Sequence, residues 1–201
     1  MPISPEAKLL GQLIEIPSYS GEEEKIAVFI GDWLRSQGLD VIHQDGNVLG
    51  HLQGKDQSRA FILNSHMDTV AAGESWQRNP FSPRVEGTRM YGLGSSDMKG
   101  GLASSLSTAK RFAEQGTPPI DLWFTFVVRE ELDGFGTQEF AKWFDRNNYY
   151  GLYADTAAIF TEPTDLKIIQ HGHRGNIFLE AITHGDSGHA SDPKHIQTHS
   201  V

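Results

Sequence analysis

The stretch RAFILNSHMD, residues 59–68, joins a buried-strand pattern to two polar side chains, and the chain repeats this form twice. A short apolar run bounded by polar residues is typical of a strand that is buried on both faces. DLWFTFVVREE (121–131) and AAIFTEP (157–163) are built in the same way, because each apolar run ends in carboxylates. Three predicted strands therefore end in possible metal ligands: His66-Met67-Asp68, Glu130-Glu131 and Glu162. Asp97 is likewise expected after a short strand-like run, which makes four clusters.

Helical patterns separate these strands and predict a parallel sheet. Residues 98–115 have the pattern of a helix that begins just after Asp97, and residues 137–144 have helical character between the second and third strands. Strands that alternate with helices form parallel βαβ units, and ligands of such sheets collect beyond the carboxyl ends of the strands. We therefore predict an α/β fold with a mixed, largely parallel sheet flanked by helices, and we expect all four clusters, Asp97 included, at one edge of it.

Two helices and a hairpin are expected before the first of these strands. The first helix begins after Ser4 and is stopped by Pro17. Ser20 and Glu23 form a capping-box pattern at the start of the second helix, and Gly38 is suited to end it. The dipeptide Asp45-Gly46 is a strong signal for a hairpin turn. The strands of this hairpin are expected at residues 39–43 and 47–52. After Glu162, two antiparallel strands are expected at residues 166–170 and 176–183.

The composition narrows the classes of function. The 201 residues carry a formal net charge of -9, and this balance argues against nucleic acid as a partner, because binding to phosphate needs a basic face. The chain has no cysteine, so a metal would be bound by His, Asp and Glu alone. No apolar run is long enough to span a bilayer, and the first residues do not resemble a secretion signal. We expect a cytoplasmic protein.

Each polar cluster also has an ordinary interpretation. His66 and Asp68 lie on one face of an extended segment, yet a His-x-Asp triplet alone is more often a simple turn. Asp97 follows a glycine-containing loop and is suited to cap a helix, whereas the loop matches neither known phosphate-binding fingerprint. Glu162 alone is compatible with an exposed acidic turn. Four such clusters at strand ends of one short domain are an improbable accident, and together they predict a metal site.

The adjacent carboxylates of Glu130 and Glu131 suggest the chemistry of this site. Two anions directly after an apolar strand repel each other unless a cation or a proton compensates their charge. One of them can bind metal while the other serves as a general base toward a metal-activated water. An exposed acidic turn with Arg129 as an ion-pair partner is the alternative.

The motifs of this chain resemble those of the zinc-dependent peptidase family M20, most closely its acetylornithine deacetylase and succinyl-diaminopimelate desuccinylase branch. The resemblance covers nearly the whole chain, and the order and spacing of the motifs fit the family. The motifs are SHMDTV (65–70), the segment 76–81 that ends in NPF, MYGLGSSDMKGG (90–101), REE (129–131), TEPT (161–164), GHRG (172–175) and SGHASDP (187–193).

The resemblance implies a role for each cluster and two divalent metal ions, zinc or else cobalt or manganese. His66 and Glu162 would bind the first metal, Asp97 would bridge the two metals, and Glu131 would bind the second. Glu130 would be the general base. The expected reaction is hydrolysis of the acyl-amide bond of an N-acyl amino acid by a metal-activated water.

Two further roles follow from the same resemblance. Asp68 would steer the imidazole of His66, and His189 would be the lid-domain histidine that reaches the substrate carbonyl. Members of the family are often homodimers through the lid domain.

The resemblance also divides the chain and shows what it lacks. Residues 1–168 would be an incomplete metal-binding catalytic domain of the zinc-peptidase type, and residues 169–201 the start of an α+β lid or dimerisation domain. Members of the family are close to twice as long and supply a late histidine to the second metal, a motif that neither His195 nor His199 matches. We expect the first metal site to form, the second to lack one ligand, activity to be weak, and uncovered apolar faces to favour association. Arg129 replaces an aspartate that is common in the family.

Three other functions were compared with this hydrolase. The first is a relative that keeps the fold only as a metal-binding or assembly module, and the second is a dipeptidase or carboxypeptidase of the same family. The third is a serine protease, suggested by the sequence GDSG at 185–188. It is rejected, because that motif belongs to an all-β fold whereas this chain alternates strands with helices.

Overall fold

The structure is a computed structural model that describes residues 3–172. The chain divides into two units, Met1–Leu166 and Lys167–Val201, and all of the described helices and strands lie in the first. The predicted strand at 176–183 and the predicted lid histidine His189 lie outside the described residues. The predicted domain boundary after residue 168 stays a prediction for the same reason.

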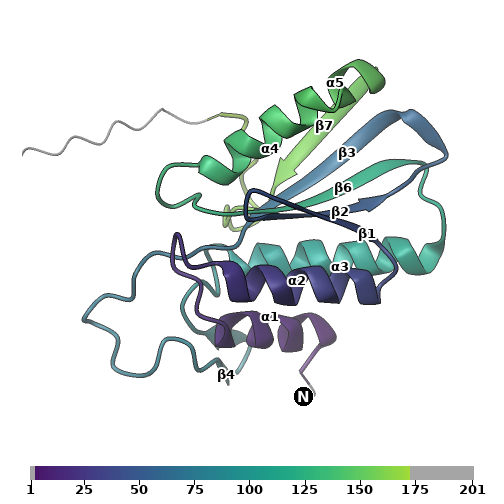
Figure 1. The fold of residues 1–201 in the computed structure, drawn as a ribbon. Helices are drawn as coiled ribbons and strands as arrows, with labels where there is room; N and C mark the ends of the chain where they lie inside the picture. The colour runs from purple at the N-terminus through teal and green to yellow at the C-terminus, as the bar shows by residue number, and fades with distance from the viewer. Residues whose placement is uncertain (1–2, 173–201) are drawn as a thin grey trace, which may run out of the picture. The chain divides into compact units, whose positions relative to one another are not determined.

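A five-stranded sheet forms the centre of the first unit (Figure 1). Three of its strands run parallel to one another in the order β6 (Ile120–Val127), β3 (Asp56–His66) and β7 (Asp155–Phe160). The hairpin of β1 (Asp40–Gln44) and β2 (Asn47–Leu52) adds to β6 in antiparallel orientation. The predicted α/β fold with a mixed sheet and flanking helices is thereby confirmed.

Helices cover both faces of this sheet, as Figure 1 shows. Helices α2 (Glu24–Ser36) and α3 (Lys99–Gln115) lie on one face, and α4 (Phe135–Arg146) with the short α5 (Tyr149–Leu152) lies on the other. Strand side chains alternate between the two faces. In β6, Phe124 and Phe126 therefore belong to the core under α2 and α3, whereas Trp123 belongs to the core under α4.

Most of the features predicted for the N-terminal helices and hairpin are confirmed. The Oγ of Ser4 accepts a hydrogen bond from the amide of Ala7 and so caps α1 (Pro5–Glu15). Asp45 and Gly46 both have positive φ, 50° and 89°, as a tight hairpin turn between β1 and β2 requires. Gly38 has a φ of 84° directly after the end of α2, which is the position that favours glycine after a helix.

The connections of β3 and β6 leave one end of the sheet in opposite directions. The chain leaves β3 toward α3 on one face, and it leaves the neighbouring strand β6 toward α4 on the opposite face (Figure 1). Adjacent parallel strands whose connections diverge in this way leave room for a ligand beyond their carboxyl ends. His66 ends β3, and the Glu130-Glu131 pair follows β6, so both lie at this end of the sheet.

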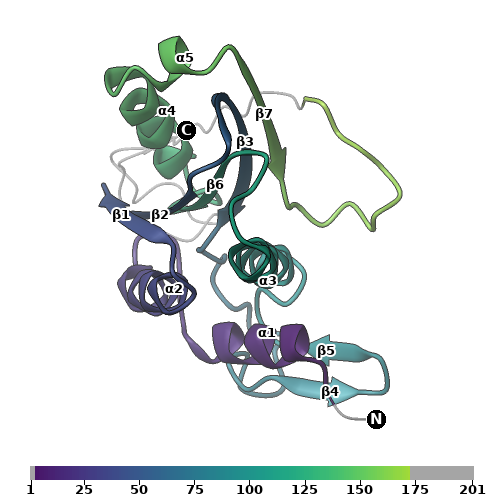
Figure 2. The same ribbon diagram turned by 90° about the vertical axis from the view of Figure 1, so that its right-hand side faces the viewer.

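Two local expectations were wrong, and one element was missed. The capping box of Ser20 and Glu23 does not form, because Glu23 takes the cap position of α2 without a side-chain cap bond. Residues 166–170 form a turn and an irregular segment instead of a strand. A small hairpin, β4 (Arg84–Glu86) with β5 (Arg89–Tyr91), was not foreseen and lies beside α1 (Figure 2).

The outer strand β7 is exposed along its whole length. Its apolar residues Ile159 and Phe160 are 53% and 55% exposed, so one edge of the sheet presents apolar side chains to solvent. Among the described residues, no helix combines the length and the apolarity needed to cross a membrane.

Candidate metal centre

The side chain of His66 is the buried centre of the polar cluster. His66 ends β3 and is only 1% exposed. Its Nδ1 lies 2.9 Å from the carbonyl oxygen of Asp68 and 3.3 Å from the Oδ1 of the same residue. These contacts leave Nε2 directed at the other carboxylates of the cluster. An imidazole that is held on one nitrogen and directs the other at carboxylates has the arrangement of a metal-ligating histidine.

Asp97 reaches the same place by a different route from the one expected. Its Oδ1 lies 3.2 Å from the Nε2 of His66. Asp97 does not follow a strand of the central sheet, however, because it lies in the loop between β5 and α3. Three of the four clusters therefore come from strand ends, and the fourth comes from the loop that precedes a helix on the face of the sheet.

The three glutamates complete the cluster. Ligand atoms of His66, Asp97 and Glu131 all lie within 4.8 Å of one another. The Oε2 of Glu130 and the Oε1 of Glu162 each lie 4.0 Å from the Nε2 of His66. The structure thus brings together His66, Asp97, Glu130, Glu131 and Glu162.

Asp68 holds the turn that carries two of these glutamates. Its buried carboxylate accepts the backbone amide of Glu130 on Oδ1 at 3.0 Å and that of Glu131 on Oδ2 at 3.1 Å. Oδ2 also accepts the hydroxyl of Ser20 at 2.6 Å. Asp68 therefore contacts His66 and the Glu130-Glu131 turn together, whereas the sequence assigned it only to His66.

The pKa values show how strongly the charges of the cluster interact. Burial would lower the pKa of His66, but hydrogen bonds to Asp68 and Asp97 outweigh it and raise this pKa to about 10. Burial, together with the neighbouring carboxylates of Asp97 and Glu130, raises the pKa of Glu162 to about 7. Burial also raises the pKa of Glu131. The carboxylates thus stabilise positive charge and repel one another.

The cluster fits a divalent cation on chemical grounds. One imidazole nitrogen and several carboxylate oxygens are ligands that zinc accepts. A bound cation would offset both the burial and the carboxylate repulsion that raise the pKa of Glu131 and Glu162. These nitrogen and oxygen ligands do not discriminate sharply between zinc, cobalt and manganese.

Gly101 sets the distance between Asp97 and Glu162. It lies in the first turn of α3, and a Cβ on Gly101 would stand 2.1 Å from the carbonyl oxygen of Thr161, directly before Glu162. We expect Gly101→Ala to lower the free energy of unfolding by about 1–3 kcal/mol, because overpacking separates the helix from the strand end. Urea unfolding and Co²⁺ titration measure the loss of stability and of affinity.

Gly11→Ala is the matched control for this substitution. Gly11 also lies within a helix, but its nearest neighbour is a side-chain atom of Pro83 at 3.8 Å. Alanine there is expected to keep or slightly raise stability, because it is the better helix former. Equal stability and equal metal affinity of Gly101→Ala and the unchanged chain would contradict the close contact.

Lys99 is a structural residue that the sequence reasoning missed. Its side chain is fully buried, and its Nζ donates hydrogen bonds to the carbonyl oxygens of Leu13 at 2.9 Å and Ile16 at 2.7 Å. Lys99 thereby joins the start of α3, two residues after Asp97, to the end of α1. The only available signal was its position between Asp97 and the Gly100-Gly101 pair.

The fold and the cluster define an α/β protein with a candidate metal centre beyond the carboxyl ends of its parallel strands. The family model described as Peptidase family M20/M25/M40 matches residues 62–198, and the chain belongs to this family. The resemblance of its motifs to peptidase family M20 is therefore confirmed.

Similar proteins cover most of the chain. It is 34% identical over 193 residues to a peptidase M20 domain-containing protein of Schizosaccharomyces pombe, a match that spans 90% of this chain and 44% of the relative. It is 28% identical to the succinyl-diaminopimelate desuccinylase of Blochmanniella floridana, over 94% of this chain and 52% of the relative. The chain thus spans about half the length of these curated relatives.

A solved structure shows the same fold. The M20 family metallo-carboxypeptidase Sso-CP2 of Sulfolobus solfataricus superposes with a TM-score of 0.64 at 20% identity, over 79% of this chain and 37% of the other. At this identity the likeness concerns the arrangement of the sheet and its helices.

Proposed function

We propose that this chain is the metal-binding catalytic part of a hydrolase that cleaves amide bonds. The observation that carries the proposal is the convergence of His66, Asp97 and Glu131 within 4.8 Å, with Glu130 and Glu162 at 4.0 Å from the same imidazole nitrogen. The named relatives, a desuccinylase and a metallo-carboxypeptidase, support this class of reaction.

His66, Asp97 and Glu162 would hold one divalent metal, and Glu131 would contribute to a second with Asp97 between them. When bound, the metals supply Lewis acidity that activates water and polarises the amide carbonyl. The late histidine of the family would be the further ligand of the second metal.

Glu130 is the residue that we assign to proton transfer. Its carboxylate is about half exposed, at 47%, and faces the cluster without being buried in it, so a substrate and water can reach it. In this role Glu130 takes a proton from the attacking water and later delivers it to the departing amine. Its backbone amide is held by Asp68 at 3.0 Å, and this bond fixes the base relative to the imidazole.

The substrate that we infer is an N-acyl amino acid, as in the deacetylase and desuccinylase branch. The motifs around residues 172–175 and 187–193 support this branch, but they lie almost wholly outside the described residues. A peptide is the second candidate, because a metallo-carboxypeptidase shares the fold. A chain that binds metal without turnover would correspond to the third candidate, a metal-binding module.

Hydrolysis of N-acetyl and N-succinyl amino acids, compared with dipeptides, tests the proposal directly. We expect activity that is lost with a chelator, is restored by Zn²⁺ or Co²⁺, and falls at least about 100-fold in Glu130→Gln. Glu114→Gln near the end of α3, where the carboxylate is exposed, is the control for loss of a carboxylate. Metal binding with no turnover of any substrate would favour the metal-binding module, and the absence of any metal binding would exclude both.

A further inference from the structure

The segment 16–23 connects α1 to α2 and forms hydrogen bonds with loops that carry residues of the metal cluster. Between α1 and α2 it makes a parallel bridge from Tyr19 to Thr69. The amide of Thr69 donates to the carbonyl oxygen of Ser18 at 2.8 Å, and the Oγ of Ser18 donates to that of Met67 at 2.8 Å. The segment is therefore joined to the loop directly after His66.

Ser20 extends this connection to the acidic turn. Its Oγ donates to the Oδ2 of Asp68 at 2.6 Å, and the same oxygen accepts the amide of Glu131 at 3.1 Å. A hydrogen bond to a carboxylate is among the stronger ones in proteins, and it fixes the rotation of the carboxyl group. Ser20 thus determines where Asp68 holds Glu131.

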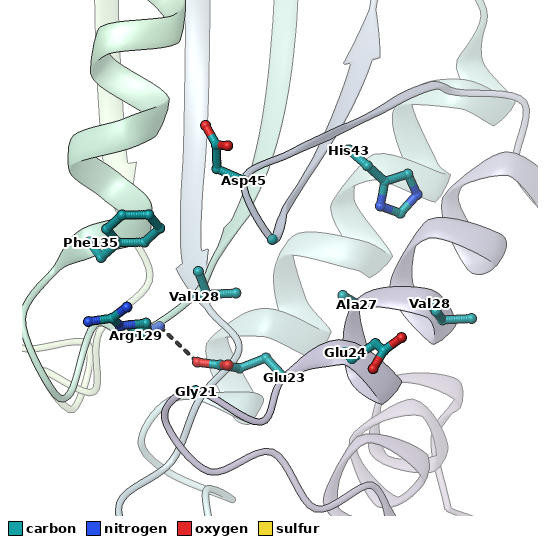
Figure 3. Close-up of a pocket in the computed structure, with 11 residues that line it drawn as sticks. Gly21, Glu23, Glu24, Ala27, Val28, His43, Asp45, Val128, Arg129 and Phe135 are labelled. Carbon is teal, nitrogen blue, oxygen red and sulfur yellow. Dashed lines mark hydrogen bonds between the residues drawn. The ribbon is translucent and has the colours of Figure 1, made fainter.

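Glu23 holds the other end of the same turn. Its side chain is 5% exposed, and its Oε1 accepts the backbone amide of Arg129 at 2.9 Å (Figure 3). Arg129 has a φ of 57°, an unusual conformation for a residue with a side chain. Glu23 therefore stabilises the sharp bend that turns the chain from β6 into the Glu130-Glu131 pair.

The side chain of Arg129 points away from Glu23 at this joint. Figure 3 shows its guanidinium beside Phe135, with the ring centroid 4.9 Å away, and it pairs with Asp133. An open pocket of about 390 Å³ is lined by Glu23, Arg129 and Phe135 among others. The arginine that replaces the expected aspartate is therefore neutralised by Asp133, while only its backbone takes part in the bend.

Lys99 anchors the near end of the segment. Its Nζ donates to the carbonyl oxygen of Ile16 at 2.7 Å. The segment 16–23 consequently contacts three of the four places that carry proposed ligands: the start of α3, the residues after His66 and the turn after β6.

We propose that Ser20 and Glu23 are positioning residues that set the Glu130-Glu131 turn for metal binding and proton transfer. The two residues do not serve the helix that they precede, because α2 has no side-chain cap. Their buried or half-buried polar atoms are instead directed at the acidic turn, 106 positions along the chain in the case of Glu23 and Arg129. This role rests on the proposed function of the cluster.

Amide hydrogen exchange of the metal-free chain tests whether Ser20 and Glu23 hold the Glu130-Glu131 turn in place, independently of metal binding. We expect Ser20→Ala and Glu23→Ala to exchange the amides of Glu130 and Glu131 about tenfold faster, because charge-assisted or buried hydrogen bonds limit local opening. Ser20→Thr keeps the hydroxyl and Glu23→Gln keeps an accepting oxygen, so both should restore slow exchange. Amides of β1 and β2 should stay unchanged, whereas a general loss of stability would accelerate them too.

Two control variants match the substitutions in kind. Ser58→Ala removes a serine hydroxyl that donates to an aspartate, Asp56, at the same distance of 2.6 Å but at the exposed start of β3. Glu22→Ala removes an exposed carboxylate from the same segment. Neither should change the exchange of Glu130 and Glu131.

Titration of the same variants with Co²⁺ separates this inference from the proposed function. Loss of a hydrogen bond that supports a metal ligand typically costs about tenfold or more in metal affinity. We expect this loss of affinity in Ser20→Ala and Glu23→Ala only. If the unchanged chain binds no Co²⁺, the proposed function fails. The exchange result still decides whether Ser20 and Glu23 position the Glu130-Glu131 turn. Unchanged exchange in both alanine variants overturns the inference.

Discussion

Asp68→Ala is expected to abolish metal binding and to lower the free energy of unfolding by about 3–5 kcal/mol, the range for breaking a buried charged network. The carboxylate of Asp68 is fully buried and is contacted by the imidazole of His66, by the hydroxyl of Ser20 and by two backbone amides. Alanine leaves the hydroxyl and the two amides without this acceptor, whereas the imidazole keeps only the backbone carbonyl oxygen of residue 68. Because buried donors without partners carry a desolvation penalty, the turn and the imidazole should both move.

Urea unfolding and Co²⁺ titration measure the two parts of this expectation. Asp68→Asn keeps the shape and one accepting oxygen. We expect an intermediate loss, because its NH₂ group must replace either Oδ1, which accepts the amide of Glu130, or Oδ2, which accepts the amide of Glu131 and the hydroxyl of Ser20. Asp56→Ala is the control, since Asp56 also accepts a serine hydroxyl but is fully exposed. Full metal affinity of Asp68→Ala would mean that the Glu130-Glu131 turn keeps its position without the hydrogen bonds to Asp68.

The sequence predicted the strands of this site better than its supports. The apolar runs before His66, Glu130 and Glu162 define β3, β6 and β7 to within a few residues, because buried strands need continuous apolar sequence. Convergence of their ends then follows from parallel pairing, which the alternation of strands and helices implies.

The loop that carries Asp97 and the segment 16–23 were beyond this reasoning. Asp97 was expected after a strand of the sheet, but a loop before α3 delivers it, because an apolar run alone does not say which sheet a strand joins. Ser20 and Glu23 match a local capping pattern, yet both bind the acidic turn. A single sequence does not show whether a polar side chain such as that of Ser20 or Glu23 bonds a nearby helix end or a turn far along the chain.

Affinity for a divalent metal is expected to rise steeply with pH because metal and protons compete for the same atoms. The pKa of His66 in the metal-free chain is raised to about 10 by Asp68 and Asp97 despite burial, and that of Glu162 is raised to about 7, mainly by burial. At neutral pH the imidazole therefore carries a proton that metal must displace. Each pH unit above 7 should increase the affinity about tenfold, because one proton leaves.

Below pH 7 the dependence should become steeper. Glu162 then also carries a proton, so the increase should approach about a hundredfold per unit when two protons leave. Co²⁺ titration from about pH 6 to about pH 8.5 should span roughly a thousandfold in affinity. Glu162→Gln, although weaker, should keep a single slope of about tenfold per unit across the range. A plateau just above the ordinary histidine value of 6.5 would contradict the charge coupling in the cluster.

The same pKa values predict that the stability of the metal-free chain falls as the pH rises, whereas its affinity for metal increases. His66 has a higher pKa folded than its ordinary value of 6.5, so the stability that it contributes is complete below that pH and is lost as the pH rises toward 10. Glu162 also has a higher pKa folded, and the unfolded chain loses its proton first, so stability falls between about 4.5 and 7. The metal-free chain should therefore weaken as the pH rises, while binding strengthens. The difference in Tm between the metal-loaded and the metal-free chain should widen with pH, which thermal unfolding at matched ionic strength measures.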